Sequence, residues 1–219
     1  MKIELNHFVY EIKKEFRRKN CGFDHTPSND FVKSQWQNRS NNIAYLIYRW
    51  IVVAFFTTAL IVSMIEAASN SALLLLFIYF TTWSVIQCLL TNLLAAVLAT
   101  IWHLQPEYAG KLVTCESVCN PFNIYWAMHV LSLVSSILVT VIYWCFLYEA
   151  NEDSLSAANI LTHILNCVSM LSDLLIVAHP LRLLHIFLPI AYGLIYAFFS
   201  IIYQFSGGHN RYNSFHVLQ

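Results

Sequence analysis

Five long stretches of the chain are predominantly apolar, and most charged residues lie outside them. Each stretch reaches the ~20 residues that an α-helix needs to cross the hydrocarbon core of a bilayer. They run roughly over Ile43–Ile65, Ala72–Trp102, Ile124–Leu147, Ala157–Ala178 and Leu184–Phe205. The pattern predicts an all-α fold, a polytopic membrane helix bundle of about five transmembrane helices.

The second stretch is longer than one crossing requires. It therefore either tilts or extends past the bilayer, or divides into two helices and gives a sixth span. The chain divides into three parts. We expect an N-terminal segment over residues 1–42, the transmembrane bundle over 43–206 and a short C-terminal tail over 207–219.

The composition agrees with a protein surrounded by lipid. Hydrophobic residues make up 58% and charged residues 11%, whereas a soluble domain has about 25% charged residues. The formal net charge is zero, which disfavours a nucleic-acid-binding protein because such proteins carry a basic excess. We expect an integral membrane protein of the plasma membrane or endoplasmic reticulum, with membrane lipids and no nucleic acid as partners.

Basic residues are concentrated at the N-terminal end. Eight of the 12 Lys and Arg precede residue 43, at Lys2, Lys13, Lys14, Arg17, Arg18, Lys19, Lys33 and Arg39. Because cytoplasmic segments carry such an excess, residues 1–42 are predicted to be cytoplasmic; a surface that touches anionic lipid is the alternative. Loops with Lys111 and Arg182 alternate with loops that lack basic residues. Five spans then place the N-terminus inside and the C-terminus outside.

Three of the stretches carry polar residues at steps of three and four, which puts them on one helix face. The faces are Thr81, Ser84, Cys88 and Thr91; His129, Ser132, Ser136 and Thr140; and His163, Asn166, Met170 and Asp173. A bundle can turn these stripes inward around a small cavity. The plainer interpretation of the Ser and Thr residues is bonding to their own helix carbonyls and helix packing.

Ionisable residues inside a span point to a functional site. The intramembrane polar residues singled out are Arg49, His129, Asn166 and Asp173. For Arg49 we expect a side chain that extends towards the cytoplasmic headgroups, with an internal ion pair as the alternative. Asp173 is either functional or a structural partner for Arg49 or Arg182.

Thr81 and His163 are the candidate catalytic pair. Thr81 lies nine residues, or ~14 Å, from the outer start of its span, and His163 six residues, or ~9 Å, from the outer start of its own. Both side chains are thus expected in the outer half of the bundle. A Thr hydroxyl activated by a His base is a nucleophile for acyl transfer.

Among the six cysteines, Cys115 and Cys119 form a spaced pair in a loop predicted to be cytosolic, with His103 nearby. A metal site needs four preformed ligands. The favoured interpretation is reduced thiols or a palmitoylation site, so no metal and no cofactor are expected.

The order of several segments resembles the Rolling stone family of multi-pass membrane proteins. They are Ser34–Gln37, Tyr48–Trp50, Phe77–Trp83, His179–His185, Tyr203 and Gly207–Gly208. The resemblance covers most of the chain from Ser34 to Gly208. It implies a membrane protein linked to myoblast fusion in insects, without an established chemical activity. A role in cell fusion or membrane contact is therefore the leading hypothesis.

A more distant similarity is to the androgen-induced family of membrane hydrolases, which cleave fatty-acid esters of hydroxy fatty acids with an intramembrane Thr and His. Phe77–Trp83 is similar to the segment that holds their Thr, matching Thr81, and Asn159–His163 to the segment that holds their His, matching His163. The alternative hypothesis is accordingly a lipid ester hydrolase, and whether the protein is an enzyme stays open. A transporter or channel that uses the polar stripes is a third hypothesis, disfavoured by the lack of repeated halves.

Overall fold

The structure, a computed structural model, describes residues 16, 22–23, 25, 27–37, 42–113, 120–148 and 156–207. Among these residues, five helical spans are long and apolar enough to cross a membrane. They are Ile43–Ser69, Phe80–Leu104, Pro121–Leu147, Ala157–Ile176 and Leu183–Phe205. The predicted all-α bundle of about five spans is confirmed.

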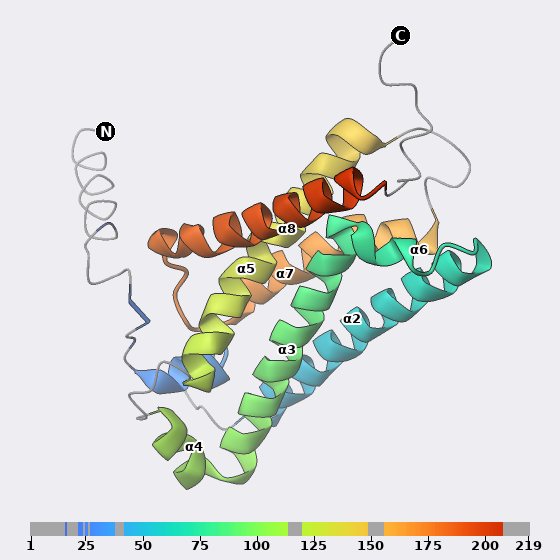
Figure 1. The fold of residues 1–219 in the computed structure, drawn as a ribbon. Helices are drawn as coiled ribbons and strands as arrows, with labels where there is room; N and C mark the ends of the chain where they lie inside the picture. The colour runs from blue at the N-terminus through green and yellow to red at the C-terminus, as the bar shows by residue number, and fades with distance from the viewer. Residues whose placement is uncertain are drawn as a thin grey trace, which may run out of the picture.

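Several spans join helical segments of different type. In chain order the elements are the 3-10 turn η2 (Ser28–Val32), α2 (Ile43–Ser69), the 3-10 turn η3 (Leu75–Ile78), α3 (Phe80–Leu104), α4 (Pro106–Val113), α5 (Pro121–Ile142), the π-helical turn η4 (Tyr143–Leu147), α6 (Ala157–Ile160), the π-helical turn η6 (Leu161–Leu165), α7 (Asn166–Ile176), the 3-10 turn η7 (Leu183–Ile186) and α8 (Phe187–Phe205). The third span thus ends in a π-helical turn, and the fourth contains another near its start (Figure 1).

Polar side chains fix where three helices begin. The residue before each helix accepts a hydrogen bond from a backbone N–H of the first turn, which otherwise lacks a partner. The bonds run to Asn42 Oδ1 from Ala44 N (2.8 Å), to Asn120 Oδ1 from Phe122 N (2.9 Å) and to Ser156 Oγ from Asn159 N (3.2 Å). Pro121 occupies the first position of α5, where a missing N–H costs nothing.

The second span begins at Phe80, so the prediction of one helix running from Ala72 is wrong. The turn η3 precedes it, and Tyr79 between them is extended (φ −86°, ψ 135°). An unpaired carbonyl is costly in lipid, and side chains donate hydrogen bonds to the backbone carbonyls at this break. Thr82 Oγ1 donates to Leu76 O (2.7 Å), Trp83 Nε1 to Phe77 O (2.8 Å) and Tyr196 Oη to Ile78 O (2.9 Å). Within the described residues the break adds no sixth span.

A short helix, α4, lies between the second and third spans, where the sequence indicated a loop. Pro106 is its first residue and Glu107 lies in its first turn. Both are favourable at a helix start, because proline has the required φ and a carboxylate interacts well with the positive end of the helix dipole. Leu112 and Val113, at its end, pack against a core that includes Phe31 and Phe122.

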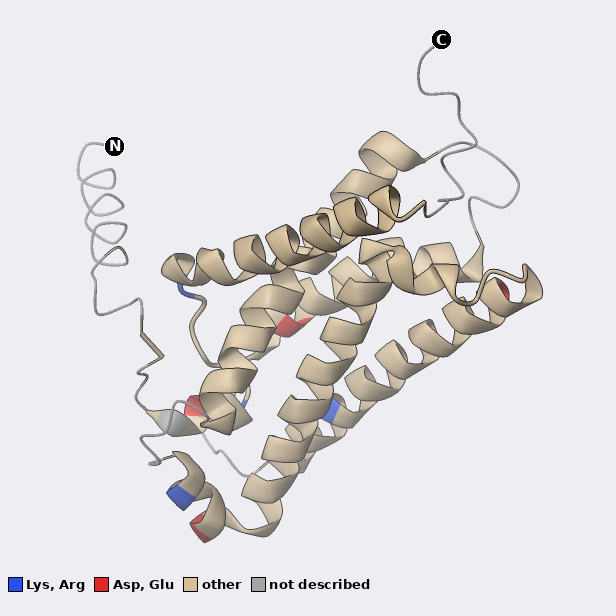
Figure 2. Cartoon of the chain, in the orientation of Figure 1, with Lys and Arg blue, Asp and Glu red and all other residues tan. Residues whose placement is uncertain are grey.

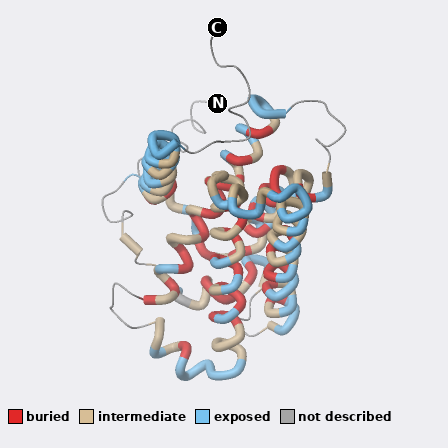
Figure 3. The backbone as a smooth tube through the Cα atoms, turned by 45° about the vertical axis from the view of Figure 1, so that its right-hand side comes forward, coloured by how far each residue is buried: buried red, intermediate tan, exposed pale blue. Residues whose placement is uncertain are grey.

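The centre of the bundle is α3. It packs against α2 and against α5, and it is the most buried of the five spans, whereas α8 is the least buried (Figures 1 and 3). Small residues such as Ala95, Ala96 and Cys88 are buried along α3 and let neighbouring helices approach closely. The outer faces of α2 and α8 are apolar and exposed, which suits contact with lipid.

The described Lys and Arg residues outside the spans, Lys33, Lys111 and Arg182, lie away from the end of α2 and are accompanied by Asp30 and Glu107 (Figure 2). At one end, Lys33 pairs with Asp30 (2.8 Å), and the Arg182 guanidinium lies 4.7 Å from the centre of the Trp126 ring. At the other end, Glu66 lies in the last turn of α2. This separation agrees with the predicted alternation of basic loops. Which end faces the cytoplasm stays a prediction.

Candidate functional site

The three polar stripes lie inside the bundle. Ten of their twelve residues are buried: Ser84, Cys88, Thr91, His129, Ser132, Ser136, His163, Asn166, Met170 and Asp173. Thr81 and Thr140 are partly buried. Thr91 Oγ1 lies 2.7 Å from Ser132 Oγ and joins α3 to α5, while Thr140 Oγ1 donates to the Ser136 carbonyl of its own helix (3.0 Å). These bonds within and between helices account for much of the Ser and Thr pattern.

A buried ion pair lies where α2 and α7 meet. Arg49 Nη1 is 2.8 Å from Asp173 Oδ1, and both side chains are fully buried. The expectation that Arg49 extends to the headgroups is therefore wrong, and its alternative, an internal ion pair, is what the structure shows. Asp173 is the partner because helix packing brings its carboxylate to the guanidinium, which offsets the large cost of burying either charge alone.

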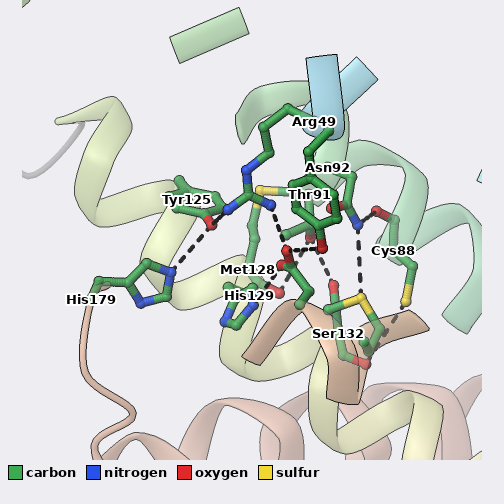
Figure 4. A network of polar contacts seen from close by, with 12 residues as sticks. Arg49, Cys88, Thr91, Asn92, Tyr125, Met128, His129, Ser132 and His179 are labelled. Atoms are coloured by element: carbon green, nitrogen blue, oxygen red, sulfur yellow. Dashed lines mark hydrogen bonds and ion pairs between the residues drawn. The ribbon is translucent and has the colours of Figure 1, made fainter. Parts of the chain in front are cut away.

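Other polar groups complete this ion cluster, which comprises Arg49, Asp173, Tyr45, Tyr48, Tyr125, His129 and His179. Figure 4 shows how Arg49, Tyr125, His129 and His179 lie relative to one another. Asp173 accepts hydrogen bonds from Tyr48 Oη (2.9 Å) and is 3.0 Å from His129 Nε2. Arg49 donates to Tyr45 Oη from Nε (2.9 Å) and to Tyr125 Oη from Nη2 (2.9 Å). The cluster ties α2, α5 and α7 together, and nearly all donors of the guanidinium have a defined acceptor.

His179 joins the cluster from the segment between the fourth and fifth spans. Its Nε2 lies 3.2 Å from Tyr125 Oη, and its ring meets that of His129 edge-on at 4.8 Å. Burial lowers the pKa of His179 well below the usual value, and the nearby His129 and Arg49 lower it further. The imidazole is therefore neutral at physiological pH.

A cavity of about 250 Å³ lies at the other end of the bundle. Its walls are the end of α2, the turn η3, the start of α3, and the two π-helical turns with α6. The lining residues are Leu60, Ser63, Glu66, Ala67, Asn70, Ala72, Leu75, Leu76, Tyr79, Thr81, Thr82, Val85, Tyr143, Leu147, Ala158, Asn159, Thr162 and His163. Thr81 and His163 thus border the same cavity, although they come from different spans.

The π-helical turn η4 packs against His163, which lies in the other π-helical turn, η6. Its ring stacks on that of Tyr143 with centroids 3.7 Å apart and planes 8° apart, and Trp144 Nε1 donates to the His163 carbonyl (3.3 Å). The side chain is 8% exposed, and its Nδ1 is buried without a hydrogen-bond partner. Since π-helical turns widen the helix and recur at functional sites, the place of His163 in η6 at the cavity wall makes it a candidate site residue.

Thr81 and Thr82 lie side by side but are used differently. The Thr82 hydroxyl is taken by the Leu76 carbonyl (2.7 Å), whereas no hydrogen bond of the described residues occupies the Thr81 hydroxyl. No hydrogen bond joins Thr81 to His163 in this part of the chain either. To react as a pair, the two side chains would have to come within hydrogen-bond distance in the substrate complex.

Several residues of both sites were not singled out from the sequence. Tyr45, Tyr125 and His179 belong to the ion cluster, and Glu66 lines the cavity. The i to i+4 spacing of Tyr45 and Arg49 is a signal for the first of these, but no local pattern indicates the others. The proposed pair Cys115 and Cys119 lies outside the described residues, so the question of a metal or palmitoylation site stays a prediction there.

Comparison with known proteins finds a family match along nearly the whole chain. A family model described as Protein rolling stone matches residues 2–219. A curated protein of Drosophila melanogaster named Protein rolling stone is 32% identical over 216 residues, which is 96% of this chain and 78% of that protein. No solved structure matches the chain at a significant level.

Proposed function

This chain belongs to the Rolling stone family of multi-pass membrane proteins, and from that membership we propose a role in cell fusion or in contact between membranes. The observation that carries this proposal is the match along nearly the whole chain, spans and connecting segments included. The family resemblance implies the link to myoblast fusion.

Knock-down and rescue test this role. The protein is depleted in a cell type that expresses it, and fusion or adhesion events are counted. We expect fewer events, and recovery when the wild-type chain is supplied again. Rescue with Thr81→Ala separates two cases, since recovery by this variant means that the role needs no chemistry at Thr81. An unchanged count after depletion would contradict the proposal.

The cavity favours a second function, an intramembrane lipid ester hydrolase. The supporting observation is that Thr81 and His163 border one cavity among apolar side chains. In the proposed step the Thr81 oxygen attacks the ester carbonyl carbon while His163 accepts the hydroxyl proton. The bond to the alcohol oxygen breaks, and His163 returns the proton to the leaving alcohol. Water then cleaves the acyl-threonine by the same route and releases the fatty acid.

The purified protein assayed with fatty-acid esters, including those of hydroxy fatty acids, tests the hydrolase. Turnover should fall by at least ~10²-fold in Thr81→Ala and in His163→Ala, because each removes a partner of the transfer. Thr58→Ala serves as the control, since Thr58 is exposed and bonds only to its own helix at the Ala54 carbonyl (2.9 Å). Turnover that survives both cavity variants would rule out this mechanism.

A further inference from the structure

The described lining of the cavity carries negative charge. Among the described residues, its lining includes one carboxylate, Glu66, and no Lys or Arg. The described Lys and Arg residues belong to the other end and to the ion cluster: Lys33, Arg49, Lys111 and Arg182 (Figure 2). An anionic ligand in this cavity would therefore meet a like charge and no compensating cation from the part of the chain that the structure describes.

Glu66 is held in place at the cavity wall. Its Oε1 accepts a hydrogen bond from Ser156 Oγ (3.2 Å), which ties the tip of α2 to the start of α6. The residue is partly buried, so its charge acts through a medium less polar than bulk water. The carboxylate is thus a fixed element of the cavity and not a side chain free in solvent.

Hydrogen-bonding groups without charge complete the polar part of the lining. They include His163, Ser63, Asn70 and Thr81, which line the same cavity. The remaining wall is mostly apolar, with Leu60, Leu75, Leu76, Val85 and Leu147. Such a lining suits a molecule that has a hydroxyl or ester at one end and a hydrocarbon chain at the other.

We propose that this cavity binds single-chain lipids with an uncharged, hydroxyl- or ester-bearing head and excludes lipids that end in a phosphate or carboxylate. The volume of about 250 Å³ lies just below that of pockets for drug-sized ligands. It therefore holds a head and the adjoining part of one chain. The inference rests on the lipid site of the proposed hydrolase but not on turnover. As a binding site, the cavity should favour simple esters over esters that carry a free carboxylate.

Two lipids that differ only in a phosphate test the charge selection. The full chain is purified in detergent, and 1-oleoylglycerol and 1-oleoylglycerol 3-phosphate compete for binding against radiolabelled 1-oleoylglycerol. The uncharged lipid should bind more tightly by roughly tenfold or more, as expected for one partly screened like-charge contact. Glu66→Gln should reduce this preference several-fold, whereas Glu107→Gln, an exposed change on α4, should not. Equal binding of the two lipids, or an unchanged preference in Glu66→Gln, would overturn the inference.

Substitution of two neighbouring alanines on α2 tests whether the lipid binds in this cavity. Ala67 lines the cavity, and Ala68 is exposed on the same turn of α2. Ala67→Phe should abolish binding of 1-oleoylglycerol while Ala68→Phe keeps it, with both variants monodisperse on gel filtration. Binding that persists in Ala67→Phe would refute the site. The two proposals can fail separately. Selective lipid binding by the wild type without any ester turnover refutes the hydrolase alone.

Discussion

Arg49 and Asp173 lie 124 positions apart in the chain, yet their buried side chains meet at 2.8 Å. Each charge alone would be costly in an apolar interior, and each is compensated by the other and by tyrosine hydroxyls. The pair therefore makes the relative position of α2 and α7 specific. Removing one partner leaves an uncompensated buried charge, whereas removing both leaves no unpaired charge.

Single and double replacements of the pair should behave differently. Arg49→Leu or Asp173→Leu should each lower the free energy of unfolding by about 3–5 kcal/mol. The double variant should lose less than the sum of the two, because no charge remains unpaired. Unfolding in mixed detergent, followed by tryptophan fluorescence, measures the three values. Additive losses would argue against a coupled pair.

A pH dependence is expected from His179. Because its pKa is lowered in the folded state, the unfolded chain binds the proton first as pH falls below ~6.5. Stability should therefore be unaffected by His179 above that pH and should decrease progressively below it. Thermal unfolding between pH 8 and 5 measures the slope, and His179→Gln should make it smaller. An identical slope in wild type and variant would show that His179 does not contribute.

At the scale of elements, close packing of α3 depends on small side chains. Ala96 is fully buried, while Val97, the next residue, is 38% exposed on the lipid side. Thr91 adds a hydrogen bond to Ser132 across the interface with α5 (2.7 Å). Without water to exclude, such helices associate through van der Waals contact and these few polar bonds.

Enlarging the buried position should separate the helices. Ala96→Leu is expected to destabilise the bundle by about 1–3 kcal/mol because the added atoms have no space. Val97→Leu adds a methylene facing lipid and should change little. Thermal unfolding of both variants in the same detergent gives the comparison. A stable Ala96→Leu would mean that the interface is less tightly packed than the structure shows.

The breaks in the spans are also element-scale features. The turns η3, η4 and η6 interrupt regular helix at or near the cavity, and Tyr143 and His163 come from two of them. Hydropathy does not register a π-helical turn, because the residues remain apolar and the hydrogen-bond shift is small. The start of the second span was misplaced because the residues of the 3-10 turn η3 (Leu75–Ile78) are equally apolar.

At the scale of the whole molecule, the ion cluster and the cavity lie at different depths, and none of the described Lys and Arg residues lines the cavity. The N-inside arrangement predicted from Lys and Arg places the cavity near the outer face. The positive-inside rule concerns a few residues in short loops here, so direct labelling is the appropriate test.

Cysteine labelling measures the sidedness. Cys21, Cys115, Cys119 and Cys145 are replaced by Ser, and Lys111→Cys and Glu152→Cys are introduced separately. In sealed microsomes a membrane-impermeant maleimide should label Lys111→Cys directly, because cytoplasmic loops face outwards. Glu152→Cys should react only after detergent is added. The reverse pattern would show that the chain has the opposite orientation.

By itself the sequence determined the class of fold, because runs of ~20 apolar residues cross a bilayer whatever their packing. It also placed the polar stripes inside the bundle, since a spacing of three and four fixes a helix face. For Arg49 it favoured the headgroups and gave an internal ion pair only as the alternative, because the partner of a buried charge is chosen by helix packing between residues far apart in the chain. For the same reason Glu66, His179 and the closeness of Thr81 and His163 to one cavity emerged only from the tertiary structure, which alone decides which faces meet.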